Sequence, residues 1–436
     1  MKKMAETSVC QRGRPLNTLL RTALLSGLAA ALAACGSGED STNRGSLNSV
    51  TLTVALSRSV IDAATPGLGQ LVGSASKCDV SQHKLVYDTV DPRGNGARAS
   101  AGLLIPSGCS GPFPVLVYHH GTTVTRSFTM SDPQNTEAGL QMGVFAAQGY
   151  VVVMPDYLGY GDSTLGYHPY LHAENTAAVS VDALRAAKKA LADKGVVTSG
   201  KLFLAGYSQG GHSAMATHRT IERDHANEFT VTASMPMAGP YALEQTFVEG
   251  IAAPGQGATV FSSMVFVGYQ KAYGDVYAKA EDVFQAPWVN GIESLLPGTL
   301  GFNELFTTGK LPLALTGPGG LLTASFVSSF ASDPNNAARK RTAQNNLLDW
   351  KPKAPMALCA GSRDPVVPVK NMVSAATYFA SQGVQVTPID VEQVPDFAPV
   401  IAAQVAADPG LLTYHGTIVP PLCVALAKNM VFDPRK

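Results

Sequence analysis

Short hydrophobic runs alternate with longer helical patterns from about residue 84 to the end of the chain. Alternation of this kind predicts βαβ units, in which helices connect the strands of a mostly parallel sheet. "FPVLVYHHG" and "YVVVMPD" are almost continuously hydrophobic, which is typical of central strands buried on both faces. The same form recurs in "GKLFLAGYS", "VTASMPMAG" and "APMALCAG". We therefore expect an α/β fold with a mostly parallel central sheet flanked by helices.

Other segments predict the helices and the edges of this sheet. "HKLVYDTV" and "ARASAGLLIP" flank the turn cluster "DPRGNG" and predict an opening hairpin. "VQVTPIDVEQV" predicts a last strand nearer the other edge. In "ENTAAVSVDALRAAKKALADKG", Ala, Leu and Val recur at helical spacing, and Gly195 supplies a stop signal. The pattern therefore predicts both the strands and the long helices between them.

Residues of about 240–350 interrupt this alternation. They are rich in Gly, Pro, Phe and Leu, and they carry few charges. An unstructured loop of that length is implausible inside a compact domain, so we expect a largely helical cap insertion with an apolar inner surface. The alternative is a second hydrophobic core without a role in substrate binding. The folded domain, cap included, is expected to span residues 51–436.

The N-terminal residues predict an export signal. Basic residues precede an uncharged run from Thr22 to Ala34, which is too short to span a bilayer, so residues 1–34 are expected to be a signal peptide. The run ends in "LAAC", which resembles the lipobox of bacterial lipoproteins and implies lipidation of Cys35. A plain secretory signal is the alternative. Residues 35–50 are polar and are expected to form a flexible tether. We expect an outer-membrane lipoprotein or a periplasmic or extracellular protein.

The charge balance excludes two classes of partner. Lys and Arg number 32, and so do Asp and Glu, so no net charge attracts nucleic acid or an anionic membrane surface. Charged residues make up only 15% of the chain, where roughly 25% is average, which indicates a large core. We expect contact with a membrane only through the N-terminal lipid anchor.

The cysteines predict disulfides. With Cys10 and Cys35 assigned to the signal, an even number remains in an oxidising compartment, which favours two disulfides, with buried free thiols as the alternative. Three pairings are possible, and we favour the one that joins neighbours along the chain. It pairs Cys78 with Cys109, and Cys359 with Cys423.

The segment "LFLAGYSQGGHSAMA" contains a candidate nucleophile, Ser208. Gly206 and Gly210 flank this serine where a predicted strand turns into a helix, and they allow the sharp bend that exposes its hydroxyl. The backbone N–H of Gln209, at the start of the helix, is then a candidate donor to an oxyanion. The alternative is a structural serine in a glycine-rich turn.

The segment "VLVYHHGTT" supplies a second candidate oxyanion donor, the backbone N–H of Thr122. His119 and His120 raise the possibility of a metal site. Adjacent residues on a strand point to opposite faces, however, and no third ligand is suitably spaced. We therefore expect neither a metal nor a cofactor.

The base and acid are predicted from their positions late in the chain. Of nine histidines, only His415 follows residue 225, and a loop after the last strand is where this scaffold needs a base. Asp364, in "GSRDPVVP", ends a buried strand at the edge where ligands bind in open α/β sheets. Asp390 and Asp396 are alternative acids. His212 is too close to Ser208 in sequence to reach over it.

Five motifs in order, "HHGT", "PDYLGYGDS", "GYSQGG", "GSRDPVVP" and "YHGT", resemble the α/β-hydrolase superfamily. "PDYLGYGDS" and the insertion resemble the secretory lipase family and its bacterial lipoprotein relatives. The resemblance implies an α/β-hydrolase fold, with the insertion as a lid. It also implies a serine carboxylester hydrolase that acts through an acyl-enzyme on a small-molecule or lipid ester. A serine peptidase of the same fold and a non-catalytic envelope lipoprotein are the alternatives. One departure is an unusually long segment before His415.

Overall fold

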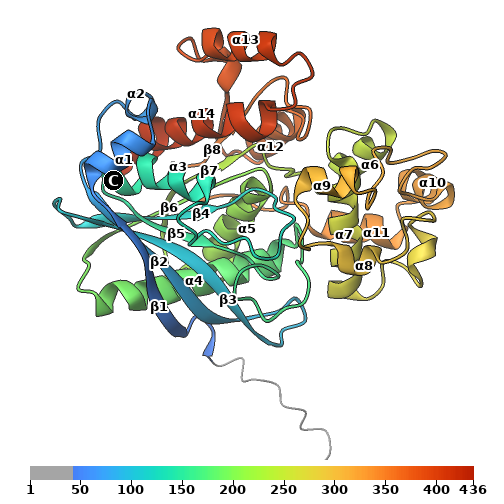
Figure 1. Ribbon diagram of the computed structural model, residues 1–436, viewed down its shortest axis with the longest axis horizontal. Helices are drawn as coiled ribbons and strands as arrows, with labels where there is room; N and C mark the ends of the chain where they lie inside the picture. The colour runs from blue at the N-terminus through green and yellow to red at the C-terminus, as the bar shows by residue number, and fades with distance from the viewer. Residues whose placement is uncertain (1–42) are drawn as a thin grey trace, which may run out of the picture. The chain divides into compact units, whose positions relative to one another are not determined.

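The computed structural model describes residues 43–436, which fold around a nine-stranded sheet (Figure 1). The strand order is β1-β2-β3-β5-β4-β6-β7-β8-β9. Strands β4 to β9 are parallel, whereas β1, β2 and β3 pair antiparallel and β3 joins β5 antiparallel. The mostly parallel sheet, its opening hairpin and its last edge strand are thus confirmed. The strands are β1 Leu47–Leu56, β2 Asp79–Val90, β3 Gly96–Ser107, β4 Phe113–His119, β5 Val151–Pro155, β6 Thr198–Tyr207, β7 Val231–Met237, β8 Ala357–Ala360 and β9 Thr387–Asp390.

Helices cover both faces of the sheet, which explains the continuous hydrophobic runs of its central strands. In β6, Leu202 and Leu204 pack toward α4, whereas Phe203 and Ala205 pack toward α3 and α14 on the opposite face. One face carries α4 Ala173–Asp193, α5 Gln209–Asp224 and α12 Lys370–Ser381. The other carries α1 Arg58–Ala64, α2 Leu68–Val72, α3 Thr136–Val144 and α14 Val419–Leu426.

The insertion between β7 and β8 is helical and has its own hydrophobic core, in which Phe266 contacts Phe326 and Phe330. Figure 1 shows its helices gathered at one side of the sheet, away from α1 and α2. We call this segment the cap. Its helices are α6 Leu243–Ala252, α7 Ala258–Tyr273, α8 Ile292–Leu295, α9 Phe302–Thr307, α10 Ala324–Ser332 and α11 Ala337–Gln344.

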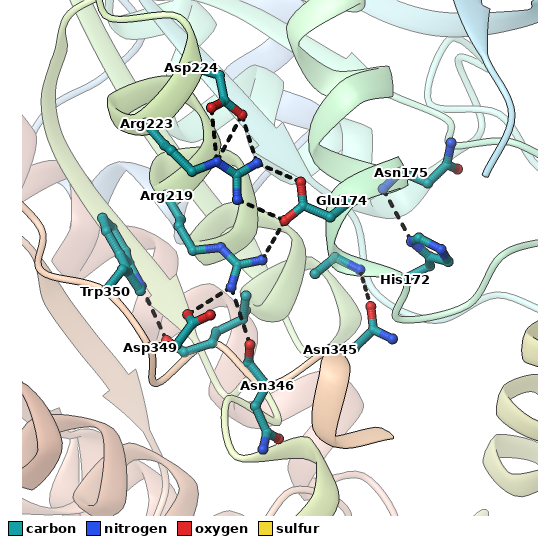
Figure 2. A network of polar contacts seen from close by, with 12 residues as sticks. His172, Glu174, Asn175, Arg219, Arg223, Asp224, Asn345, Asn346, Asp349 and Trp350 are labelled. Carbon is teal, nitrogen blue, oxygen red and sulfur yellow. Dashed lines mark hydrogen bonds and ion pairs between the residues drawn. The ribbon is translucent and has the colours of Figure 1, made fainter. Parts of the chain in front are cut away.

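A polar network fixes the segment through which the cap returns to β8 (Figure 2). Arg219 of α5 donates to Asp349 at 2.8 Å and to Glu174 of α4 at 2.9 Å, although its side chain is only 6% exposed. Asn345 accepts a hydrogen bond from the backbone N–H of Ala173 at 2.8 Å. The return segment is therefore tied to two helices that pack directly against the sheet.

The N-terminal boundary differs from the prediction. Strand β1 begins at Leu47, inside the segment expected to be a tether, and it pairs with β2. Leu47 and Val50 are partly buried, but most of this edge strand is exposed, so the hydrophobic signal is weak. The predicted signal peptide and the lipidation site Cys35 lie outside the described residues. No helix within residues 43–436 is long and apolar enough to span a membrane.

Both predicted disulfides are present, one joining Cys78 to Cys109 and the other joining Cys359 to Cys423. The second bridge links β8 to α14, the helix that follows His415. Its cysteines are separated by 64 residues, and closing a loop of that length should stabilise the fold by about 4 kcal/mol.

Removal of the Cys359–Cys423 bridge should therefore lower stability. It should also lower activity, because the bridge joins the strand before Asp364 to the helix after His415. We expect the double variant Cys359→Ala/Cys423→Ala to lose several kcal/mol of the free energy of unfolding, at most about 4 kcal/mol, and to turn over substrate more slowly. Denaturant unfolding and steady-state kinetics measure the two effects. As the control, Cys78→Ala/Cys109→Ala should lower stability without changing kcat. An unchanged stability and kcat in the first variant would contradict the prediction.

Candidate active site

Ser208 lies at the sharp turn between β6 and α5, with φ +59° and ψ −117°. A Cβ atom on Gly206 would lie 2.3 Å from the carbonyl oxygen of Gly210, and one on Gly210 would lie 1.9 Å from that of His119. Neither position can therefore accept a side chain unless the backbone moves. The two glycines permit the strained turn that places the serine hydroxyl at the end of the strand.

Three residues from distant parts of the chain meet at this turn. His415 Nε2 lies 2.9 Å from Ser208 Oγ, and His415 Nδ1 lies 2.6 Å from Asp364 Oδ2. The carboxylate can only accept, so Nδ1 carries the proton and Nε2 is free to accept from the serine hydroxyl. The other carboxylate oxygen of Asp364 accepts the backbone N–H groups of Val366 and Val367 at 2.9 and 3.0 Å. These bonds orient the acid toward the imidazole.

The alternative acids occupy other environments. Asp390 accepts hydrogen bonds from the backbone and the hydroxyl of Ser362, and Asp396 is exposed. The imidazole of His415 thus pairs with Asp364. Tyr207 O–H, at the end of β6 just before Ser208, donates to the carbonyl oxygen of His415 at 2.7 Å and so holds His415 near Ser208. Sequence reasoning missed Tyr207, because a tyrosine before the nucleophile carries no signal of a contact so distant in sequence.

The long segment before His415 contains a helix, α13 Ala398–Ala407, and a π-helical turn, Tyr414–Ile418, that carries His415. A 3₁₀ turn, Val391–Gln393, comes before α13, so three consecutive elements lead from β9 to His415. The Cys359–Cys423 disulfide ties the end of this path back to β8, which precedes Asp364. The extra length is folded into these elements, and His415 still reaches Ser208.

The two predicted oxyanion donors lie beside Ser208. Strands β4 and β6 are neighbours, so the loop that carries Thr122 meets the start of α5 at Gln209. The Gln209 side chain points elsewhere, with its Nε2 2.7 Å from His168 Nε2. His168 Nδ1 donates to the carbonyl of Leu158, and burial lowers the pKa of His168 to about 3, so the ring is neutral and its Nε2 accepts. The Nε2 group of Gln209 is therefore engaged with His168, and the backbone N–H of Gln209 stays the candidate donor to an oxyanion.

His119 and His120 are engaged with oxygen atoms of the protein. His119 Nδ1 and Nε2 lie 3.0 Å from the carbonyl of Ala205 and from the hydroxyl of Ser180, and His120 Nδ1 lies 2.7 Å from the carbonyl of Gly121. Burial lowers the pKa of each imidazole to about 4, so both are neutral. Within residues 43–436, no cluster of three or more His, Cys, Asp or Glu side chains is arranged to hold a metal.

The histidines that follow Ser208 on α5 face away from the reaction centre. His212 Nε2 lies 2.9 Å from the carbonyl of Asn345, in the return segment of the cap. His218 contacts the Ser234 hydroxyl at 2.8 Å and the Glu222 carboxylate at 3.0 Å. Both imidazoles are buried packing groups.

Ser208 lines two cavities of very different size. The wider one, of about 740 Å³, is lined by residues 121–123, by His415, and by Phe302 of the cap and Leu412. The narrower one, of about 90 Å³, runs under the cap between α6 and α7, and no charged residue lines it. A substrate carbonyl at Ser208 therefore lies beside both a small apolar space and a larger space, and the two cavities also share Gln256, Phe261 and Val366.

Glu137 is a wall residue of the wider cavity that the sequence does not predict. Its carboxylate accepts hydrogen bonds from Tyr118 O–H at 2.8 Å and from the backbone N–H of Gly121 at 3.1 Å. Burial raises the pKa of this carboxyl to about 7. In the sequence, Glu137 lies two residues after the N-cap Asn135 and resembles any acidic residue in the first turn of a helix.

Comparison with known proteins supports the same fold. Residues 116–396 match the model of the family described as the alpha/beta hydrolase family, a range that includes Ser208 and Asp364 and ends before His415. No curated protein sequence matches the chain.

The similar solved structures include hydrolases. A ligand-bound form of the rice cell wall degrading esterase LipA from Xanthomonas oryzae is 34% identical, with a TM-score of 0.80, covering 90% of this chain and 100% of that chain. A putative hydrolase from Legionella pneumophila is 27% identical, with a TM-score of 0.72 and coverages of 79% and 91%. Candida antarctica lipase A shares the fold at 15% identity, with a TM-score of 0.57 and coverages of 79% and 76%. With its sheet, its nucleophile turn and this family match, the chain belongs to the alpha/beta hydrolase family.

Proposed function

We propose that the protein is a serine hydrolase of carboxylic esters, of the carboxylesterase or lipase type. The observation that carries this proposal is the hydrogen-bonded series of Ser208, His415 and Asp364 beside the two cavities. The similarity to the esterase LipA supports an ester over other acyl substrates.

The proposed reaction proceeds through an acyl-enzyme. His415 Nε2 takes the hydroxyl proton of Ser208 as Oγ attacks the ester carbonyl, and the backbone N–H groups of Thr122 and Gln209 stabilise the oxyanion. The C–O bond to the alcohol breaks, and His415 returns the proton to the leaving alkoxide. The same imidazole then deprotonates a water molecule, which releases the carboxylic acid and regenerates the serine. Asp364 orients the imidazole and stabilises its charged form.

We propose that the acyl group occupies the narrower cavity and the alcohol group the wider one. The narrower cavity is apolar, as an acyl chain requires, and its volume of about 90 Å³ limits the chain length. A water molecule takes up roughly 30 Å³ in the liquid, so the cavity accepts about three groups of that size. The preferred substrate is thus an ester of a short acyl chain with a larger alcohol.

Gly250→Leu should shorten the preferred acyl chain. Gly250 lies on α6 at the wall of the narrower cavity, and a Cβ atom there meets nothing within 4 Å, so a leucine can extend into the space. We expect kcat/KM for butanoate and longer esters to fall by roughly tenfold or more, with acetate changed less than about threefold. A series of nitrophenyl esters measures this.

Gly416→Leu is the matched control, because Gly416 lines the wider cavity and a Cβ atom there also meets nothing within 4 Å. This variant should change the response to alcohol size and leave the acyl preference intact. If Gly416→Leu rather than Gly250→Leu shifted the acyl preference, the assignment of the two cavities would be reversed.

The ester assignment is tested by comparing nitrophenyl esters of rising chain length with a peptide amide as substrates of the wild-type protein. We expect turnover of the esters only. Turnover confined to the amide would favour a peptidase of the same fold. Failure to hydrolyse either substrate, together with no labelling by a fluorophosphonate, would favour a non-catalytic envelope lipoprotein.

We also propose that the protein is exported and contacts a membrane only through an acyl anchor on Cys35. Two disulfides support an oxidising compartment, since such bonds are rare in reducing ones. Metabolic labelling with a fatty-acid analogue, with Cys35→Ala as the control, tests the anchor.

A further inference from the structure

Glu137 is a partly buried carboxylate without a cationic partner. It lies in the first turn of α3, and it takes part in none of the ion pairs formed among residues 43–436. Its hydrogen bonds come from the Tyr118 hydroxyl and from the backbone N–H of Gly121. A partly buried, unpaired carboxylate is costly for stability, and such groups concentrate at functional sites.

Glu137 and His120 hold Gly121 from its two sides. Glu137 accepts the N–H of Gly121, which belongs to the His120–Gly121 peptide, and His120 Nδ1 lies 2.7 Å from the Gly121 carbonyl oxygen, which belongs to the peptide that carries the Thr122 N–H. A peptide unit is planar, so fixing the Gly121 carbonyl also fixes the direction of the Thr122 N–H in the same plane. The Thr122 hydroxyl is held in turn by Tyr170 O–H at 2.8 Å. The proposed oxyanion donor is thus restrained by three side chains.

We propose that Glu137 is a positioning residue whose carboxylate holds the Gly121 N–H, one peptide before the proposed oxyanion donor, so that the Thr122 N–H stays directed at the oxyanion. This inference rests on the proposed ester hydrolysis. Glu137 does not touch the reacting atoms, and it acts through the backbone of Gly121. Its role thus differs from that of Asp364, because Glu137 orients the oxyanion donor whereas Asp364 orients the imidazole of His415.

The charge of Glu137 makes this positioning sensitive to pH. The titratable groups that face it are Tyr118 of β4, Tyr157 after β5 and Tyr207 of β6, together with His415 across the cavity. Because burial raises the pKa of Glu137 to about 7, the carboxylate gains a proton as the pH falls through neutrality. A neutral carboxyl is a weaker acceptor for the Gly121 N–H than a carboxylate is.

Activity should therefore depend on the charge of Glu137, because the carboxylate form holds the Gly121 N–H beside the proposed oxyanion donor. As the pH falls through neutrality, kcat/KM of the wild-type protein should decrease as Glu137 gains its proton.

Glu137→Gln tests the inference, because glutamine keeps the shape and removes the charge. We expect kcat to fall roughly tenfold at pH 8 while KM changes less than about twofold, since the oxyanion forms after substrate binds. The decrease of kcat/KM that follows protonation of Glu137 near neutral pH should be lost. Tyr118→Phe removes a hydrogen bond that lowers the pKa of Glu137. The kcat/KM of this variant should therefore begin to fall at a higher pH than that of the wild-type protein.

Glu222→Gln is the matched control. The Glu222 carboxylate also accepts backbone N–H groups, from Lys353 and Ala354 at 2.8 Å, but it does not line either active-site cavity. This variant should change thermal stability and leave the pH profile unchanged. Wild-type turnover that depends on Ser208 would establish the proposed function by itself. Two results would then overturn only the role of Glu137. One is a Glu137→Gln variant with the kcat and the pH dependence of the wild-type protein, and the other is a Tyr118→Phe variant whose kcat/KM falls at the same pH as in the wild-type protein.

Discussion

Ser208→Ala is expected to lower kcat for ester hydrolysis by roughly 10⁴-fold to 10⁶-fold. Without the hydroxyl, no acyl-enzyme forms, and only the oxyanion donors and the binding cavities remain to assist water. The fold should be retained, because alanine and serine both carry a Cβ atom and are about equally strained at the positive φ of this turn. Steady-state kinetics with a short-chain nitrophenyl ester and thermal unfolding measure the two quantities.

Ser213→Ala is a matched control on the same helix. Ser213 is buried one helical turn beyond Ser208, and its hydroxyl donates to the carbonyl of Gln209 at 2.9 Å. This variant should change kcat less than about threefold. Undiminished ester turnover in Ser208→Ala would refute the proposed mechanism.

Asp364→Asn should lower kcat by roughly 10³-fold to 10⁴-fold. The backbone N–H groups of Val366 and Val367 require an acceptor, so the amide oxygen faces them and the amide NH₂ faces His415 Nδ1. The ring then places its proton on Nε2, where it can no longer accept from Ser208. The imidazole remains near its position but in the wrong tautomer. A pH-dependent kinetic comparison with the wild-type protein measures this loss.

Asp390→Asn is the comparison that identifies the acid. Asp390 bonds to Ser362 and not to the imidazole, so its variant should retain kcat within about threefold. A loss in Asp390→Asn as deep as that in Asp364→Asn would show that the acid is assigned wrongly.

The sheet could be predicted because strands that are buried on both faces are hydrophobic at nearly every position. The run from Leu202 to Tyr207 is hydrophobic at every position except Gly206, since alternate side chains pack against helices on opposite faces. Strand β1 was harder to locate, because an edge strand that is mostly exposed need not be hydrophobic. Its start at Leu47 therefore follows from pairing with β2, which no local pattern reveals.

The candidate site was predictable to the extent that each residue sits at a recognisable turn. Gly206 and Gly210 are required because a Cβ atom at either position would lie less than 2.5 Å from a backbone oxygen, and Asp364 follows a buried strand. Glu137 and Tyr207 act through contacts that depend on how separate segments pack, and their residue types are common. The sizes of the two cavities likewise depend on the packing of the cap, so acyl length could not be read from the sequence.

Labelling by a fluorophosphonate, followed by mass spectrometry of the digested protein, tests the role of Ser208 directly. An activated serine should become phosphonylated once per chain, with the adduct on the peptide that contains Ser208. The label should be absent from Ser208→Ala and slowed in Asp364→Asn. An adduct on a different residue, or undiminished labelling of Ser208→Ala, would contradict the proposed mechanism.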